Sequence, residues 1–152
     1  MPITVTAPRG ALTPSGEREI LPRLTAALIE VSGVTGNAFF TPLVGGTVHV
    51  VDPRDVYAGG ANRPVVMVEL KLPNIGLPTV EARAAFIAAA TDIVAELAIP
   101  GRDRDDIWVN ILNAEDGAWG IGGRAYTGDA LIAATAEAAQ DADASARPGL
   151  LR

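Results

Sequence analysis

The chain has 152 residues with 18 acidic and 12 basic side chains, which give a formal net charge of −6. This length predicts one domain with a sizeable core, and the negative charge argues against nucleic acid or acidic membrane surfaces as partners. The sequence has no cysteine and one histidine, which excludes disulfides and thiol nucleophiles and argues against a zinc site. Since it shows neither a secretory signal nor an apolar run of membrane-spanning length, we expect a soluble, cytoplasmic protein.

Apolar spacing and turn residues predict the same order of elements in each half of the chain: a strand, a helix, a strand and a short hairpin ending in two glycines. Alternating apolar residues indicate strands, apolar residues three and four apart indicate helices, and Pro, Gly, Asn and Asp mark the turns. In the first half we expect these elements at 2–6, 13–32, 46–51 and 57–60. In the second half we expect them at 65–72, 78–97, 106–112 and 113–123.

The two halves also share short motifs. Pro14-x-x-Glu17 recurs as Pro78-x-x-Glu81, and each hairpin carries a glycine pair. Two βαβ units with right-handed crossovers would form a four-stranded mixed sheet of the α+β class, with both helices on one face. The expected domain covers 1–126, with units at about 2–60 and 64–124, followed by an Ala-rich helix and tail over 127–152. Because the strands are too apolar to leave the other sheet face wet, we expect oligomerisation to cover it.

The first strand offers a group that no side chain carries. If the initiator Met1 is removed, Pro2 has an unblocked secondary amine at the start of a strand, a position where proline is tolerated. An α-amino group titrates near pH 8, roughly, so desolvation or a nearby positive charge would lower its pKa toward neutrality. A neutral amine of this kind can act as a general base. With Met1 retained, the nitrogen is part of an amide and is not basic.

Several other residues are candidates for a site near this amine. Asn110 lies in a predicted strand between apolar neighbours, so its amide needs a partner, either structural or a ligand. Trp108, two residues away, shares the same strand face and would either pack in the core or join the site. Lys71 and Arg9 could hold an acidic substrate or keep Pro2 neutral by repelling its proton, or could simply lie at the surface.

A strand opened by Pro2, the tandem βαβ order and the hairpin over 119–123 together resemble the tautomerase superfamily. The hairpin is similar to the one in 4-oxalocrotonate tautomerase, and the strands at 48–51 and 108–110 are similar to those of macrophage migration inhibitory factor, which has two such units per chain and forms a trimer. The resemblance covers roughly residues 2–124. It implies the tautomerase fold, a homotrimer and catalysis by Pro2 without a cofactor or metal.

The resemblance also implies roles for particular residues. Asn110 would be catalytic and Trp108 would bind substrate, both reaching Pro2 of a neighbouring subunit. Asn37 takes the place of a substrate-binding lysine of the inhibitory-factor group. The remaining substrate-binding candidates are Lys71, Trp119 in the hairpin, and an apolar wall residue at Leu72 or Pro73.

Two departures from the superfamily argue against hydrolytic dehalogenation and against a dicarboxylate substrate. Residues 73–76 lack the arginine pair of the cis-3-chloroacrylic acid dehalogenase group, and no arginine begins the first helix, where 4-oxalocrotonate tautomerase binds a carboxylate. We therefore expect a keto–enol tautomerase for a small 2-oxo acid or aryl-enol substrate. The alternatives are a decarboxylase or hydratase of the same superfamily, which would require a cationic carboxylate site, and a non-catalytic binding protein with the same fold.

Overall fold

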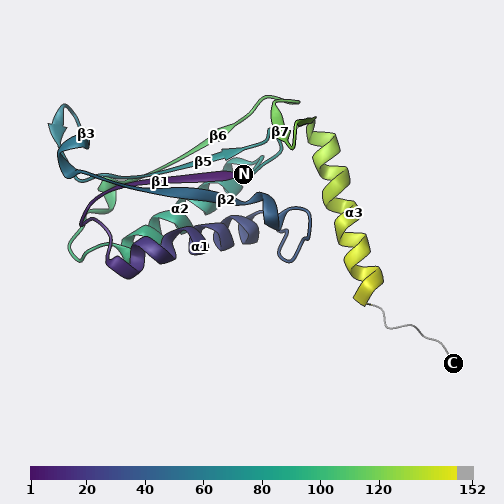
Figure 1. Ribbon diagram of the computed structural model, residues 1–152, viewed down its shortest axis with the longest axis horizontal. Coiled ribbons are helices and arrows are strands. Elements are labelled where there is room, and N and C mark those ends of the chain that lie inside the picture. Colours follow the sequence, from purple (N-terminus) through teal and green to yellow (C-terminus); the bar gives the residue numbers. More distant parts are fainter. Residues whose placement is uncertain (147–152) are drawn as a thin grey trace.

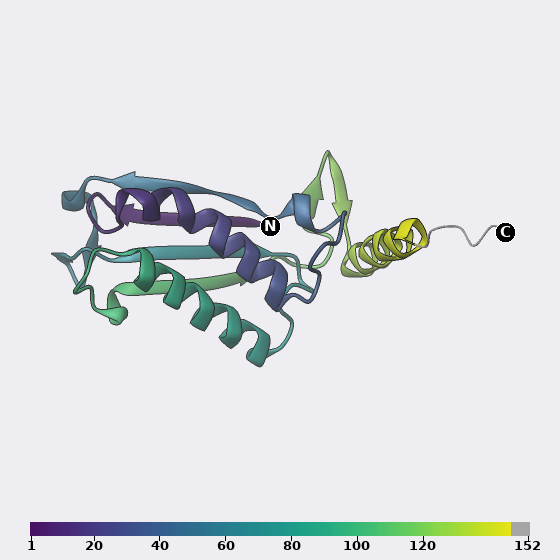
Figure 2. The same cartoon turned by 90° about the horizontal axis from the view of Figure 1, so that it is seen from below.

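The computed structural model describes residues 1–146. Its main sheet contains β1 (Pro2–Pro8), β2 (Gly45–Val51), β5 (Val66–Leu72) and β6 (Ile107–Asn113) in the order β2-β1-β5-β6. The pairs β1–β2 and β5–β6 are parallel, and β1–β5 is antiparallel. The helices α1 (Pro14–Val31) and α2 (Val80–Leu97) both cover the same face of this sheet (Figures 1 and 2). The predicted α+β fold of two tandem βαβ units is thus confirmed.

Two hairpins and a third helix complete the described chain. The hairpins are β3 (Tyr57–Ala58) with β4 (Ala61–Asn62), and β7 (Trp119–Ile121) with β8 (Arg124–Tyr126). The helix α3 (Gly128–Ala146) projects from the end of the sheet at which the N-terminus lies (Figure 1). Short 3₁₀ turns occur at Thr41–Leu43, Pro53–Asp55 and Arg104–Asp106. The tail expected after α3 lies outside the described residues.

The glycine pairs were expected to end the hairpins, but they form the turns at the hairpin centres. Gly59 and Gly60 join β3 to β4, and Gly122 and Gly123 join β7 to β8. All four have φ between +58° and +81°, the conformation that a two-residue type I′ hairpin turn requires at both positions. A second strand therefore returns after each pair, and the second hairpin continues to Tyr126.

Strand β1 is longer than predicted, because Ala7 and Pro8 continue it. Both are paired in register with β2, opposite Val50 and Val51. Proline is accommodated at the last position because the next residue, Arg9, supplies the N–H that bonds to the Val51 carbonyl at 2.9 Å.

Both central helices begin at a threonine cap, which reflects the sequence repeat. The Thr13 hydroxyl accepts a hydrogen bond from Gly16 N at 3.0 Å, and the Thr79 hydroxyl accepts one from Ala82 N at 3.1 Å. Each cap satisfies a backbone donor that has no intrahelical partner.

Among residues 1–146, no helix is long and apolar enough to cross a bilayer.

The core lies between the sheet and the two helices. Alternate strand residues such as Ile3, Val5, Val68 and Leu70 are fully buried there, as the period-two pattern predicts. The helices contribute buried residues at helical spacing, and these are Ile20, Leu24 and Leu28 of α1 and Phe86, Ala90 and Val94 of α2.

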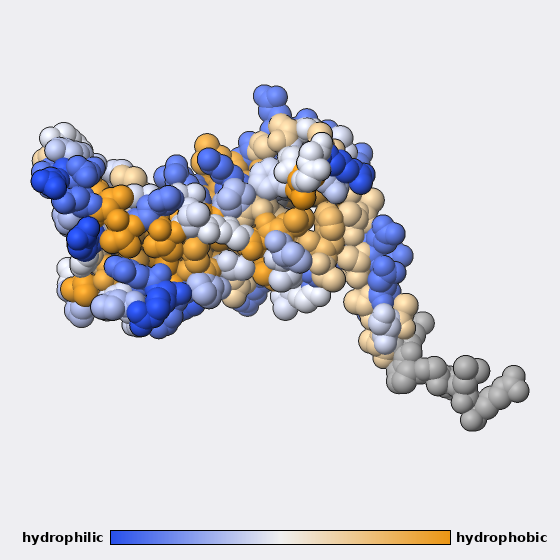
Figure 3. Space-filling model, in the orientation of Figure 1, coloured by the Kyte–Doolittle hydropathy of each residue, from blue (hydrophilic) through white to orange (hydrophobic). Residues whose placement is uncertain are grey.

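The other face of the sheet has no helix on it, and we call it the open face. Its side chains form rows across the strands, of which Thr47, Thr4, Glu69 and Asn110 form one, and His49, Thr6, Met67 and Trp108 the next. Trp108 and Leu112 are 39% and 50% exposed on it. Figure 3 adds an apolar band along the side of the molecule where β2 and α1 lie. A single chain therefore leaves apolar surface uncovered.

Substituting Gly46 tests the close approach of β1 and β2. A Cβ at this position would overlap the Ile3 carbonyl oxygen, whereas a Cβ at Gly45 meets nothing within 4 Å. We expect Gly46→Ala to lower the free energy of unfolding by about 1–3 kcal/mol, and Gly45→Ala to change it by less than about 0.5 kcal/mol. Urea unfolding of the two variants measures this, and equal midpoints would contradict the packing described.

Candidate functional site

Pro2 begins β1 and is exposed at the edge of a cleft. The cleft has a volume of about 460 Å³ and lies between the N-terminus, the turn before β2 and the second hairpin. Its lining residues are Met1, Pro2, Pro42, Leu43, Ala118, Trp119, Gly120 and Ile121. The structure thus brings two of the candidates, Pro2 and Trp119, together in one cleft.

Met1 is buried, with 7% of its surface exposed. Its terminal amine donates a hydrogen bond to the Leu43 carbonyl, and burial lowers the pKa of that amine. The Met1 side chain also lines a small second cavity of about 80 Å³, formed mostly by apolar residues. Met1 and Leu43 are the residues common to this cavity and the cleft at Pro2. We call the second space the Met1 cavity.

Lys71 lies beside Pro2 on the open face. In the antiparallel pairing of β1 and β5, Ile3 is opposite Leu70, so the next residue of β5, Lys71, is level with Pro2. Ile3 and Leu70 both point into the core, and alternation therefore places Pro2 and Lys71 on the same outer face. Lys71 is the single lysine of the sequence and is exposed, so its charge lies near the start of β1.

Asn110 and Trp108 lie on the open face as well, but farther from Pro2. Asn110 is level with Glu69 and Thr4, two residues along β1 from Pro2 and two strands away. Trp108 is level with the sixth residue of the chain, about 13 Å along the strand from Pro2 at about 3.3 Å per residue. The Trp108 indole N–H donates to the Asp105 carbonyl at 3.0 Å, which leaves the ring exposed. Within one chain neither residue joins the Pro2 cleft.

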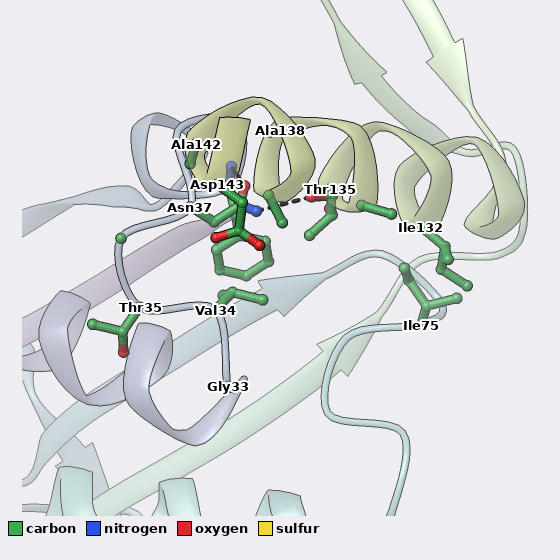
Figure 4. Close-up of a pocket in the computed structure, with 14 residues that line it drawn as sticks. Gly33, Val34, Thr35, Asn37, Ile75, Ile132, Thr135, Ala138, Ala142 and Asp143 are labelled. Atoms are coloured by element: carbon green, nitrogen blue, oxygen red, sulfur yellow. Dashed lines mark hydrogen bonds between the residues drawn. The ribbon is translucent and has the colours of Figure 1, made fainter. Parts of the chain in front are cut away.

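Asn37 is buried and its amide is used for structure. The Oδ1 atom accepts hydrogen bonds from Phe39 N at 3.1 Å and Phe40 N at 2.9 Å. The Nδ2 atom donates to the Thr135 carbonyl of α3 at 2.9 Å, as the dashed line in Figure 4 marks. Asn37 therefore shapes the turn that carries the two phenylalanines and ties it to α3.

The remaining candidates lie on other parts of the fold. Leu72 is 1% exposed, in the core beneath the sheet, whereas Pro73, the alternative at this place, lines the Met1 cavity. Arg9 follows β1 at the end opposite Pro2. Of the two cationic candidates, Lys71 alone is thus near the terminal amine.

A larger groove of about 590 Å³ runs between α3 and the segment after α1 (Figure 4). It is lined mostly by small residues, with Ile75 and Ile132 facing each other at one end. Asp143 is the one titratable side chain in its lining. No cluster of His, Asp or Glu within residues 1–146 could hold a metal ion. The Pro2 cleft is the better match to the sequence analysis, because it brings together two of the predicted site residues, Pro2 and Trp119.

Comparison with solved structures identifies the fold. Native fused 4-OT, a 4-oxalocrotonate tautomerase, matches with a TM-score of 0.69 and 22% identity over 87% of this chain and 99% of its own. FG41 malonate semialdehyde decarboxylase matches with 0.61 and 20% over 80% and 89%. Macrophage migration inhibitory factor of Toxoplasma gondii matches with 0.64 and 17% over 83% and 100%. Fused 4-OT is described as symmetric and asymmetric trimers. Neither protein-family models nor curated proteins match the sequence.

The chain has the tautomerase-superfamily fold. The resemblance based on Pro2, the tandem units and the second hairpin is thereby confirmed for the fold.

Sequence reasoning missed several residues around the terminus of this tautomerase fold. Phe39 and Phe40 line the Met1 cavity together with Leu131 of α3. Phe39 also lies near Tyr126 of the hairpin, with ring centroids 6.3 Å apart, and the Arg124 guanidinium stacks over Tyr126 at 4.7 Å. The consecutive phenylalanines were a local signal, since two large apolar residues in a short loop need a place to be buried.

Asn37 can be tested as a structural residue. Asn37→Ala removes the acceptor for two backbone N–H groups and the donor to α3, so we expect a loss of about 1–3 kcal/mol in the free energy of unfolding. Asn37→Asp keeps the acceptor but turns a carboxylate oxygen toward the Thr135 carbonyl, so it should also lose stability and recover part of the loss at low pH, where a protonated carboxyl can donate to that carbonyl. Denaturant unfolding measures both variants. A change in KM with unaltered stability in both would instead favour a direct role in substrate binding.

Proposed function

We propose that this chain, after removal of Met1, is a keto–enol tautomerase acting on a small 2-oxo acid or aryl-enol substrate. The observation that carries the proposal is the position of Pro2, at the start of a central strand, in a cleft with Trp119 and level with Lys71. The neutral amine takes the proton from the enol oxygen as the carbonyl forms. The protonated amine then returns that proton to the neighbouring carbon, so no cofactor is required.

Two physical effects would keep the Pro2 amine neutral. The Pro2 nitrogen would lie in a cleft lined mostly by apolar residues, and partial desolvation there would lower its pKa. The Lys71 ammonium, level with Pro2, disfavours a second positive charge. A proton carrier with a pKa near the working pH contributes roughly 10²–10⁴-fold to the rate.

We propose a homotrimer, in which the open face is covered and the site is completed between chains. Support comes from the exposed Trp108 and Leu112 on that face and from the trimers of fused 4-OT. Asn110 and Trp108 do not join the Pro2 cleft of their own chain, so they would reach that of a neighbour. Asn110 would then hydrogen-bond the enol oxygen or a distal polar group.

A cytoplasmic location stays a prediction.

A second candidate is decarboxylation of a small oxo acid. It is favoured by Lys71, which lies where it could hold a carboxylate close to Pro2, and by the similarity to malonate semialdehyde decarboxylase. In this reaction the carbon–carbon bond to the carboxylate breaks, CO₂ leaves, and the protonated amine supplies the proton that replaces it. Release of carbon dioxide distinguishes decarboxylation from tautomerisation. If the protein catalyses neither reaction, the non-catalytic binding protein is the remaining alternative.

Pro2→Ala tests the proton carrier. In protein whose N-terminus begins at residue 2 by intact mass, we expect phenylenolpyruvate ketonisation to fall about 10²-fold or more in kcat/KM, because the amine is changed in basicity and position. Wild-type protein that retains Met1 should show a loss in kcat/KM at least as large, since its Pro2 nitrogen is an amide. Full activity in either protein rules out Pro2 catalysis.

Lys71→Gln tests the electrostatic part of the proposal. Without the neighbouring charge the pKa of the Pro2 amine rises, so the acid limb of the kcat/KM profile should move to higher pH by about 0.5–1 pH unit. Arg9→Gln is the matched control, because Arg9 lies seven residues from Pro2 along β1, beyond the roughly 10 Å screening length at 0.1 M salt. Equal shifts in both variants, or none in Lys71→Gln, would contradict this role.

A further inference from the structure

The Met1 cavity has a wall that comes from α3. Leu131 is 4% exposed and Thr135 lies one turn farther along the same helix face. Opposite them are the phenylalanine turn after α1 and the loop after β5, so the cavity is apolar apart from the Ser32 and Thr135 side chains. Gly128 and Leu131 are the buried residues of the helix, and its other residues are half-buried or exposed.

Contacts at the first turns of α3 fix that wall in place. Asp116 Oδ1 accepts hydrogen bonds from Gly128 N at 2.7 Å and from Asn74 Nδ2 at 3.1 Å. Gly128 packs so closely on the loop after β5 that a Cβ there would lie 2.6 Å from Ile75 Cγ2. One helical turn beyond Leu131, the bond from Asn37 holds α3 to the phenylalanine turn (Figure 4). Leu131 therefore lies on the anchored part of the helix.

Removal of Met1 changes the shape of this space. Met1 and Leu43 line both the cavity and the Pro2 cleft, so the two spaces meet at Met1. When it is absent, the volume of its side chain joins the cavity, and the combined pocket opens beside the Pro2 amine. A mostly apolar pocket with a polar group at its mouth suits a ligand that has one hydrocarbon end and one polar end.

We infer that α3 closes the far end of the substrate pocket, and that Leu131 determines how long a hydrocarbon substituent the substrate can carry. This rests on the proposed function, because it takes the Pro2 amine as the reactive group. The substrate class is a 2-oxo acid whose side chain is a short alkyl or single-ring group. Its hydrocarbon end occupies the space of the Met1 side chain and the Met1 cavity, and its carboxylate stays at the cleft towards Lys71.

The first test is a chain-length profile. For protein that begins at Pro2, deuterium exchange at C3 of straight-chain 2-oxo acids from four to eight carbons gives kcat/KM as a function of length. We expect a maximum in the wild type. Leu131→Ala should move it to longer acids and raise the ratio of long to short by about tenfold, since one methylene in an apolar pocket changes specificity by that order. Leu131→Phe should move it to shorter acids.

Ile132→Ala is the matched control. Ile132 neighbours Leu131 in the same helix and is of similar size, but it is 54% exposed and does not line the Met1 cavity. It should keep the wild-type maximum. If Leu131→Ala changes all acids by one factor, or shifts the profile no more than Ile132→Ala, then α3 does not set the length.

The second test detects the pocket directly and needs no substituted residue. Xenon occupies apolar cavities, so xenon-pressurised crystals of the protein beginning at Pro2 should show xenon between Phe40 and Leu131, and crystals of the Met1-retaining protein should show less. If xenon binds at this site but the protein turns over no 2-oxo acid, the proposed function is wrong and the pocket is supported. If the protein turns over 2-oxo acids but xenon occupancy is equal in both proteins, the pocket is wrong and the proposed function is supported.

Discussion

The fold depends on the pairing of β1 along both of its edges. The strand begins at the second residue of the chain and lies between β2 and β5, with Ile3 and Val5 fully buried against the helices. Chain termini usually fray unless they are tied down, and here the terminus is part of the sheet interior. The close approach at Gly46 adds to this restraint. A terminal amine held this firmly can be part of a site with defined geometry.

The surroundings of that terminus are charged on one side and apolar on the other. On the open face is the Lys71 charge, and towards α3 is the apolar Met1 cavity. Both act in the same direction on an amine between them, because burial and a nearby positive charge each favour its neutral form. In the proposed substrate the same division would separate the polar end from the hydrocarbon end. The proposed acid–base chemistry and ligand selection would then both depend on the arrangement of the first strand.

Local sequence patterns predicted the elements well, and contacts between distant segments were beyond them. The alternation of β5 identified its buried face, and apolar residues at helical spacing together with the Pro-x-x-Glu starts marked α1 and α2. The place of Asn37 was not predictable, because its amide bonds to Thr135, 98 residues away. The Met1 cavity is likewise assembled from four separate segments. Ala7 and Pro8 joined β1 because pairing with β2 outweighed their weak strand preference.

The burial of Met1 also restricts when it can be excised. In the folded chain Met1 is 7% exposed and its amine is bonded to the Leu43 carbonyl, and both restrict the approach of an aminopeptidase to the amine. Strand β1 acquires its second partner only when β5, which starts at Val66, has been made. At about 5–20 residues per second, translation leaves an interval of several seconds before that. If Met1 is removed, as the proposed function requires, its burial in the folded chain favours removal before β1 has paired on both edges.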